Sequence, residues 1–340
     1  MPRKIVLCLS HSIEEFQQLT LLHSLGHEVF SIGGYINPAH PHDTKRPAAP
    51  QVPHYPTLQQ AVDLTGGLGP AQERIPDAVF DWADTIIFHH YLDRLYGQWD
   101  SRIAPWLKRS SANRVIWRTV GQSVENNERQ GAQYRARGME ILRYSPKETS
   151  IPSYAGADGL IRFWVDPQEW SGWTGSDTRV LNITQHLKQR DPWTNHRAWL
   201  KFTKGLSTRV LGPGSEVIGV PGQVSYQEMQ EALRSARCYL YTGTQPASYT
   251  LGLIEAMMTG VPVVSIGHHW HNIFGYNKEM FEGPELAVRS ELNCDVTQEL
   301  VRLQNDLGYA QEISAQTRAR ALELFSKDTV AAQWQQFLSK

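Results

Sequence analysis

Features that assign a chain to a membrane or to the extracellular space are scarce in this sequence. Its 340 residues include only three cysteines, Cys8, Cys238 and Cys294, an odd number with no two close together. We therefore interpret them as small core residues in a reducing compartment, not as a disulfide framework. The apolar run in the opening segment, MPRKIVLCLSHS, is too short for a signal peptide or a membrane-spanning helix. The sequence thus predicts a cytoplasmic protein without a transmembrane segment.

A large excess of charge of either sign is also absent. The chain has 33 Lys and Arg against 34 Asp and Glu, which gives a formal net charge of -1. No global positive field attracts nucleic acid, so a nucleic-acid partner is not expected, although a total cannot reveal a local basic groove. Apolar residues make up 41% of the chain, enough to bury a core, and the length accommodates two domains.

Short apolar runs alternate with helical patterns along most of the chain. In the first half, strands are expected in KIVLCL, EVFSI, DTIIFHH, NRVIWRTVGQ and EILRYS. After the Trp- and Gly-containing segment 158–176, further strands are expected in TRVLNIT, TRVLG, CYLYTG, PVVSIG and LAV. Two successive series of this kind predict two doubly wound α/β domains. Residues 34–76, dense in Pro and His, interrupt the first series as an irregular segment.

One carboxylate, Glu255, stands in an otherwise apolar helix that we expect from about Thr250 to Thr259, ended by Gly260. A buried carboxylate requires hydrogen-bond donors or a cation, and the two hydroxyls of a ribose would supply such donors. The free backbone N–H groups at the helix start, near Thr250 to Gly252, suit a diphosphate. The pattern indicates a nucleoside diphosphate pocket; an ion pair between Glu255 and a Lys or Arg of the core is the alternative.

The segment LGLIEAM followed by GVPVVS resembles the donor-binding helix of GT-B fold glycosyltransferases, especially the retaining family 4 or "glycosyl transferases group 1" type. The resemblance implies that Glu255 binds the ribose and that the amides of Thr250, Leu251 and Gly252 hold the diphosphate. The family has a further Glu eight positions earlier, which contacts the sugar near the anomeric centre, and this chain has Ala247 there. Either another residue takes the place of that Glu or the donor binds differently.

The same resemblance implies a set of sugar contacts and a domain plan. Sugar contacts are expected along the segment that begins at the missing Glu, at Ala247, Ser248 and Tyr249. Two looser matches, LIRFWVDPQEW and ALELFSKDTVAAQWQQFL, resemble the family's interdomain segment and its C-terminal helices. The expected organisation is two Rossmann-like domains facing each other across a cleft. Residues 1–160 form the acceptor domain, 161–326 the donor domain, and a last helix, 327–340, packs back on the first domain.

Further site candidates come from strand ends. The family places an Arg and a Lys against the diphosphate, and the nearest candidates here are Lys188 and Arg190. The alternative is that both are ordinary charged residues of a solvated loop. In the first half, polar residues follow three predicted strands: Ser10, His11, Ser12, His89, His90, Arg118, Gly121, Gln122 and Ser123. From this set we take Gln122 and His11 as candidate catalytic residues. Gln122 stands close to the position where the family often has a His near the sugar.

No metal or other cofactor is expected. HHWH, at 268–271, has no acidic or Cys ligand in register, so a metal site there is not predicted. The chain also lacks an Asp-x-Asp motif, which the other main glycosyltransferase fold uses to hold a metal with the diphosphate. The reaction implied by the resemblance is metal-independent transfer with retention, in which helix dipole, backbone N–H groups and Arg or Lys stabilise the leaving diphosphate.

The sequence thus predicts a hexosyltransferase-type glycosyltransferase that moves a sugar from a nucleoside diphosphate sugar to a saccharide, protein or other acceptor. Three alternatives remain: a non-catalytic sugar-nucleotide binder, favoured by Ala247; a GT-B nucleotide-sugar epimerase; and a glycosyltransferase acting on modified DNA bases, disfavoured by the net charge. Several of the eleven Trp residues fall near the expected cleft or hinge, where their rings would suit a saccharide: Trp117, Trp164, Trp170, Trp173, Trp193 and Trp270. The nucleotide base, the sugar and the oligomeric state are left open.

Overall fold

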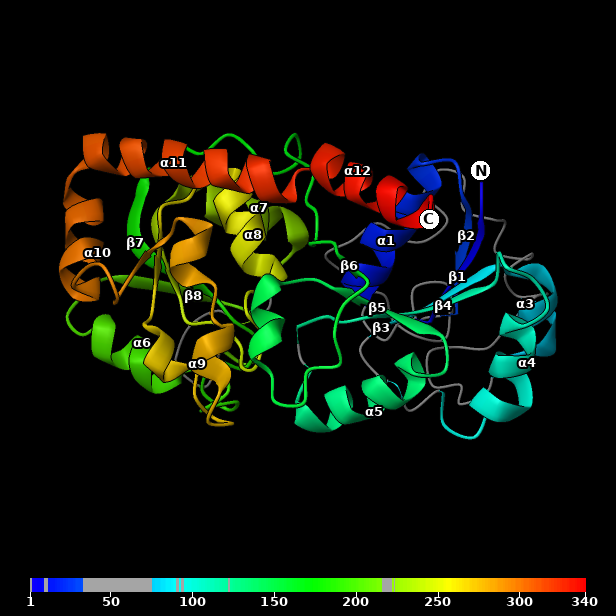
Figure 1. Cartoon of the computed structure of the whole chain (residues 1–340). Helices are drawn as coiled ribbons and strands as arrows, with labels where there is room; N and C mark the ends of the chain where they lie inside the picture. The colour runs from blue at the N-terminus through cyan, green and yellow to red at the C-terminus, as the bar shows by residue number, and fades with distance from the viewer. Residues whose placement is uncertain are drawn as a thin grey trace. The chain divides into compact units, whose positions relative to one another are not determined.

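The computed structural model describes residues 2–8, 12–32, 75–89, 92, 95–121, 123–215, 222 and 224–340. The chain divides into two compact units (Figure 1). Unit 1 comprises Met1–Pro146, Pro152–Ile161 and Ala331–Lys340, and unit 2 comprises Lys147–Ile151 and Arg162–Val330. Most of the predicted irregular segment 34–76 lies outside the described residues. None of the described helices is both long and apolar enough to cross a membrane.

Unit 1 is built on a six-stranded parallel sheet with the order β2-β1-β3-β4-β5-β6. Its strands are β1 (Lys4–Cys8), β2 (Glu28–Ser31), β3 (Thr85–His89), β4 (Arg114–Arg118), β5 (Met139–Arg143) and β6 (Gly159–Leu160). Its helices are α1 (Ser12–Ser24), α3 (Asp77–Trp82), the π-helical turn η3 (Trp99–Ile103), α4 (Ala104–Leu107) and α5 (Glu125–Arg135). Every residue of β3 and β4 is buried, as expected for parallel strands covered by helices on both faces.

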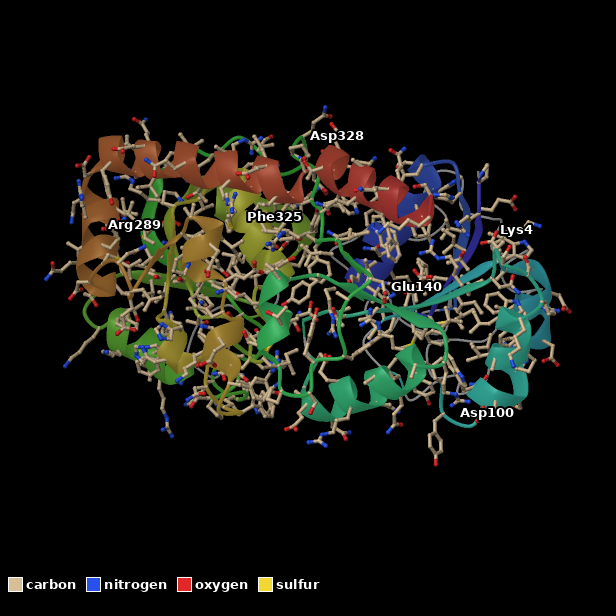
Figure 2. All side chains as sticks on the ribbon, viewed as in Figure 1. Lys4, Asp100, Glu140, Arg289, Phe325 and Asp328 are labelled. Carbon is tan, nitrogen blue, oxygen red and sulfur yellow. The ribbon has the colours of Figure 1, made fainter. Side chains whose placement is uncertain are left out.

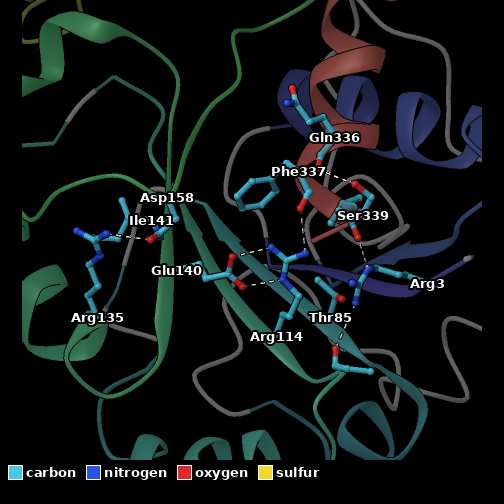
Figure 3. Close-up of polar contacts among 12 residues, drawn as sticks. Arg3, Thr85, Arg114, Arg135, Glu140, Ile141, Asp158, Gln336, Phe337 and Ser339 are labelled. Carbon is cyan, nitrogen blue, oxygen red and sulfur yellow. Dashed lines mark hydrogen bonds and ion pairs between the residues drawn. The ribbon is translucent and has the colours of Figure 1, made fainter.

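The end of the last helix, α12 (Lys327–Leu338), is fixed to unit 1 by two guanidinium groups (Figure 3). Arg114 donates to the backbone carbonyl of Phe337 at 3.2 Å and holds Glu140 through two hydrogen bonds of 2.6 Å. Arg3 donates from Nε to the carbonyl of Leu338 at 2.9 Å. These carbonyls have no partner within the helix, so cations at this end satisfy them and interact favourably with the helix dipole.

Unit 2 contains a five-stranded parallel sheet with the order β11-β10-β9-β7-β8. Its strands are β7 (Asp177–Ile183), β8 (Thr208–Leu211), β9 (Ala236–Tyr241), β10 (Val263–Ser265) and β11 (Arg289–Ser290). Its longer helices are α6 (His196–Phe202), α7 (Tyr226–Ser235), α8 (Leu251–Thr259), α10 (Val296–Asn305) and α11 (Leu307–Phe325). Its short helical turns are η4 (Pro146–Ser150, whose first residue belongs to unit 1), η6 (His268–Trp270), α9 (Asn277–Met280) and η7 (Gly283–Leu286).

Side chains of β9 alternate between the two faces of this sheet. Cys238 and Leu240 join the apolar cluster that includes Leu300 of α10. Tyr239 stands between these two residues in the strand and therefore points to the opposite face. Its phenol is near enough to Glu255 of α8 for that charge to raise its pKa. The predicted α/β organisation is confirmed in both units.

The expected last strand, LAV at 286–288, is wrong. Leu286 closes the 3₁₀ turn η7, in which its N–H donates to the Glu282 carbonyl at 3.1 Å. Ala287 has a left-handed backbone conformation, with φ of 59°. The turn therefore occupies these residues, and the strand begins only at Arg289.

Candidate functional site

The carboxyl ends of β7, β9 and β10 lie on one edge of the unit 2 sheet, because the three strands are parallel neighbours. Open parallel sheets bind ligands at this edge. β9 continues into the segment 242–250 and then into α8. As predicted, α8 ends at Gly260, whose φ of 94° gives the left-handed helix cap.

The start of α8 is accessible to a ligand. Thr250 is the N-cap residue but makes no side-chain capping hydrogen bond, and Leu251 and Gly252 are partly exposed. Within the described part of the chain, the backbone N–H groups of Leu251 and Gly252 have no acceptor; the first N–H bonded inside the helix is that of Leu253. A methyl group added at Gly252 would meet no atom within 4 Å. These N–H groups lie at the positive end of the helix dipole, where an anion binds favourably.

Glu255 lies one turn further along α8 and is 5% exposed, so the predicted burial of this carboxylate is confirmed. Its neighbourhood includes Tyr239 of β9. Burial raises the pKa of the Tyr239 phenol well above its usual value, and the nearby charges of Tyr241 and Glu255 raise it further. The Tyr239 hydroxyl donates to the carbonyl of Ile183, the last residue of β7, at 3.4 Å. Glu255 is thus placed beside the strand ends, close to the open start of its own helix.

The predicted sugar-contact residues Ala247, Ser248 and Tyr249 are all buried. The Tyr249 ring packs with Phe163 at 5.9 Å between centroids and with Phe325 at 5.4 Å. Phe325, labelled in Figure 2, is the last residue of α11. The Tyr249 ring therefore belongs to the packing of unit 2.

Arg162 and Glu282 form a buried ion pair that is connected to this segment at Ser248. The sequence did not predict this pair. Arg162 holds Glu282 through two hydrogen bonds of 2.9 and 3.2 Å, and the Glu282 N–H donates to the Ser248 carbonyl at 3.3 Å. Burial alone would lower the pKa of Arg162, but the neighbouring Tyr249 phenol and the Glu282 carboxylate raise it above its usual value. The charge of Glu282 is thus engaged by Arg162.

Gln245 connects the three strand-end segments, and it too was missed. Its side chain, in a residue only 4% exposed, donates to Asn195 Oδ1 at 2.9 Å and to the Trp270 carbonyl at 2.7 Å. The same side chain accepts from the Ile273 N–H at 2.9 Å and from Asn277 Nδ2 at 3.0 Å. An amide has two donor hydrogens and one acceptor oxygen, so its hydrogen-bonding capacity is well used here. No local sequence pattern signals this role, because all four partners come from other segments.

The predicted cations Lys188 and Arg190 lie in the segment that follows β7. Both are exposed, and neither forms an ion pair with any described residue. The Trp193 N–H donates to the Arg190 carbonyl at 2.8 Å, and the Trp193 carbonyl accepts from the Gln245 N–H at 2.8 Å. The structure therefore brings the segment with both cations next to the segment that leads into α8.

His271 is the buried member of the HHWH run. Its ring stacks on Phe281 at 4.3 Å between centroids, and neither of its nitrogens has a hydrogen-bond partner among the described residues. Burial, with help from His268 and His269, lowers the pKa of His271 to about 3, so the ring is neutral at physiological pH. Among the residues that the structure describes, no group of three or more His, Cys, Asp or Glu side chains is arranged to hold a metal ion.

The candidate catalytic residues His11 and Gln122 lie outside the described residues, as do Ser10 and His90. Arg118, at the end of β4, is fully buried and donates to the Ile161 carbonyl at 3.0 Å. It also lies 3.8 Å from Glu14; burial raises the pKa of this carboxyl to about 7, and the Arg118 charge opposes the rise.

Ser123 is also engaged inside unit 1. Its hydroxyl donates to Glu128 at 2.5 Å, and Glu128 holds the buried Arg143 through two further hydrogen bonds. Of the first-half candidates, Arg118 and Ser123 therefore belong to buried polar networks.

Searches with the sequence find no matching family model and no matching curated protein. Solved structures do match. HepE from Anabaena in complex with UDP and glucose has a TM-score of 0.62 at 11% identity, with 99% of each chain covered. A glycosyltransferase from Rickettsia africae has a TM-score of 0.63 at 12% identity, covering 99% of this chain and 98% of that chain. An alpha-glucosyltransferase in complex with UDP-glucose and DNA containing an abasic site has a TM-score of 0.61 at 9% identity, with 100% of both chains covered.

The chain has the GT-B fold. This likeness extends over nearly the whole length of each matched chain, and it confirms the predicted fold of two parallel-sheet α/β units.

Proposed function

We propose that the protein is a glycosyltransferase that moves a hexose from a nucleoside diphosphate sugar to an acceptor. The observation that carries the proposal is the pairing, on one helix, of an open N-terminus and a buried carboxylate one turn later. In this arrangement the N–H groups of Leu251 and Gly252 bind the diphosphate, and Glu255 accepts hydrogen bonds from the ribose hydroxyls. Two structures of similar fold were solved with UDP-sugar components, UDP and glucose in HepE and UDP-glucose in the alpha-glucosyltransferase.

The same arrangement supports a mechanism without a metal or cofactor. Negative charge builds on the leaving diphosphate as the bond to the sugar breaks. Fixed N–H groups and the α8 dipole stabilise that charge, and Lys188 and Arg190, on the neighbouring segment, complete its neutralisation. We propose retention at the anomeric carbon on the resemblance of the α8 segment alone. His11 and Gln122 remain candidates for the acceptor side.

A second candidate function is sugar-nucleotide binding without transfer. Ala247 has no charge to offer to the sugar, and the nearby Glu282 is held by Arg162. A binder of this kind would take up the donor and leave it intact.

Nucleotide release in the absence of metal separates these functions. The protein is incubated with UDP-, GDP-, ADP- and dTDP-sugars, beside Glu255→Ala and a matched control, Glu231→Ala, which removes an exposed carboxylate from α7. Slow hydrolysis of one donor by the wild type and the control, but not by Glu255→Ala, supports the transferase. Binding without hydrolysis supports the binder. If no donor is hydrolysed and none binds, the assignment of the start of α8 and Glu255 as the donor site is contradicted.

A further inference from the structure

Two tyrosines of β9 lie on the same face of the unit 2 sheet. Tyr239 and Tyr241 are two positions apart in the strand, so their side chains point to the same side, and their ring centroids lie 6.4 Å apart. Burial raises the pKa of both phenols. The nearby charge of Glu255 raises that of Tyr239 further, whereas the N–H and the hydroxyl of Thr250 oppose the rise at Tyr241. Tyr241 is therefore near the N-cap residue of α8, and Tyr239 is near the carboxylate one turn further along.

The two phenols differ in their hydrogen bonding. The Tyr239 hydroxyl donates to the Ile183 carbonyl at 3.4 Å. The Tyr241 hydroxyl is buried, in a residue only 3% exposed, and has no hydrogen-bond partner among the described residues. A buried hydroxyl without a partner costs free energy, so most buried polar groups in folded proteins have one. The Tyr241 O–H is thus a hydrogen-bond donor that lacks an acceptor.

An anion at the start of α8 would supply the missing acceptor. The backbone N–H groups of Leu251 and Gly252, directly after Thr250, also lack acceptors within the described part of the chain. Burial keeps the Tyr241 phenol protonated at physiological pH, so it can donate. Donors from a strand end and from a helix start are thus found near one residue, Thr250. A phosphate oxygen suits them, because hydrogen bonds to a charged acceptor are roughly twice as strong as neutral ones.

We propose that the Tyr241 hydroxyl donates a hydrogen bond to the diphosphate of the sugar nucleotide, together with the N–H groups of Leu251 and Gly252. The inference rests on the proposed function and adds to it a diphosphate-binding residue outside α8. Because the hydroxyl is buried, the half-buried Thr250 side chain, which makes no capping hydrogen bond, turns aside when the phosphate binds. Negative charge grows on the diphosphate as it leaves the sugar, so this hydrogen bond strengthens in the transition state.

The test uses Tyr241→Phe, which removes the hydroxyl and keeps the ring. The matched control is Tyr309→Phe in α11, because the Tyr309 hydroxyl donates to Glu299 at 2.5 Å. Calorimetric titration measures binding of UDP, GDP, ADP, dTDP and inorganic pyrophosphate, which carries the diphosphate alone. We expect Tyr241→Phe to bind the preferred nucleotide and pyrophosphate about tenfold or more weakly than the wild type, with an unchanged or higher urea midpoint. Tyr309→Phe should show a lower urea midpoint with unchanged affinities.

Three results would overturn the role of Tyr241 and leave the donor site in place. The first is equal affinity of the wild type and Tyr241→Phe for both ligands. The second is a loss confined to the nucleotide, with pyrophosphate binding unchanged, which would assign the hydroxyl to the base or the ribose. The third is a urea midpoint of Tyr241→Phe that falls as far as that of the control, which would mean that the hydroxyl has a partner within the fold. Failure of the wild type to bind any of these ligands would instead overturn the donor site as a whole.

Discussion

The Gln245 side chain donates to Asn195 Oδ1 at 2.9 Å, and this bond joins segments that are 50 positions apart in the sequence. Together with its bonds to Trp270, Ile273 and Asn277, it makes Gln245 the common support of three strand-end segments. The open start of α8 lies only a few residues further along the chain. The proposed donor site therefore depends on this buried amide.

Replacing Gln245 by Leu should destabilise unit 2 and weaken nucleotide binding together. Leu has similar volume but leaves several buried polar partners without a hydrogen bond, each at a cost of about 1–3 kcal/mol. We expect a total loss of roughly 3 kcal/mol in the free energy of unfolding, because the exposed members of the set can turn to water. Urea denaturation measures it. A change smaller than about 0.5 kcal/mol would show that the amide does not support these segments.

Gly252→Ala should separate stability from binding. The added methyl meets no protein atom within 4 Å, and Ala is the better helix former, so the melting temperature should stay the same or rise slightly. The methyl would, however, occupy the space in which the diphosphate is proposed to lie. We expect nucleotide affinity to fall about tenfold or more, as measured by calorimetric titration. An unchanged affinity would place the diphosphate elsewhere.

Arg162→Met should be strongly destabilising, by about 3–5 kcal/mol, because it leaves the fully buried Glu282 carboxylate without its cation. Adding Glu282→Leu removes that unpaired charge. The double variant should therefore recover much of the loss in chemical denaturation. If the double variant is as unstable as the sum of the two single variants, the two side chains are not energetically coupled.

The pH dependence of stability should carry a contribution from His271. Its pKa is about 3 in the folded chain, against 6.5 for the ordinary imidazole. Between these values the unfolded chain binds the extra proton, so this contribution to the free energy of unfolding rises with pH, is complete above pH 6.5, and is lost as pH falls toward 3.

Comparison with His271→Leu isolates that contribution. The difference in stability between wild type and variant should change by up to about 1.4 kcal/mol per pH unit between roughly pH 4 and 6. Denaturation series at several pH values measure it, and the difference should level off above neutrality. Parallel curves over the acidic range would mean that His271 titrates normally in the folded chain.

Local patterns made α8 predictable. Its apolar periodicity, the isolated Glu255 and the stop at Gly260 all lie within a dozen residues, and the structure confirms the helix, its end and the burial of Glu255. The sequence also indicated the parallel strands. One was expected in NRVIWRTVGQ, and the structure shows that RVIWR within it forms β4 and is buried along its whole length. The last strand was misplaced because Pro284 and the turn that follows it use the backbone groups that a strand needs.

The support of the site was not predictable from the sequence. Gln245 and Glu282 look like ordinary polar residues until the fold brings them to partners such as Asn195 and Arg162. Arg162 and Glu282 are 120 positions apart, so no spacing rule connects them. His271 was visible as part of a His-rich run, but its burial against Phe281 depends on packing between segments.

The most direct test of the central claim is a comparison of two nucleotides on two proteins. Whichever nucleoside diphosphate the release assay selects is titrated calorimetrically, beside its 2′-deoxy form, into wild type and Glu255→Ala. If Glu255 binds the ribose hydroxyls, the substitution should weaken binding of the ribonucleotide about tenfold or more and change binding of the deoxy form much less. Equal losses for both nucleotides, or no loss for either, would show that Glu255 does not bind the ribose diol and would contradict the donor site proposed for α8.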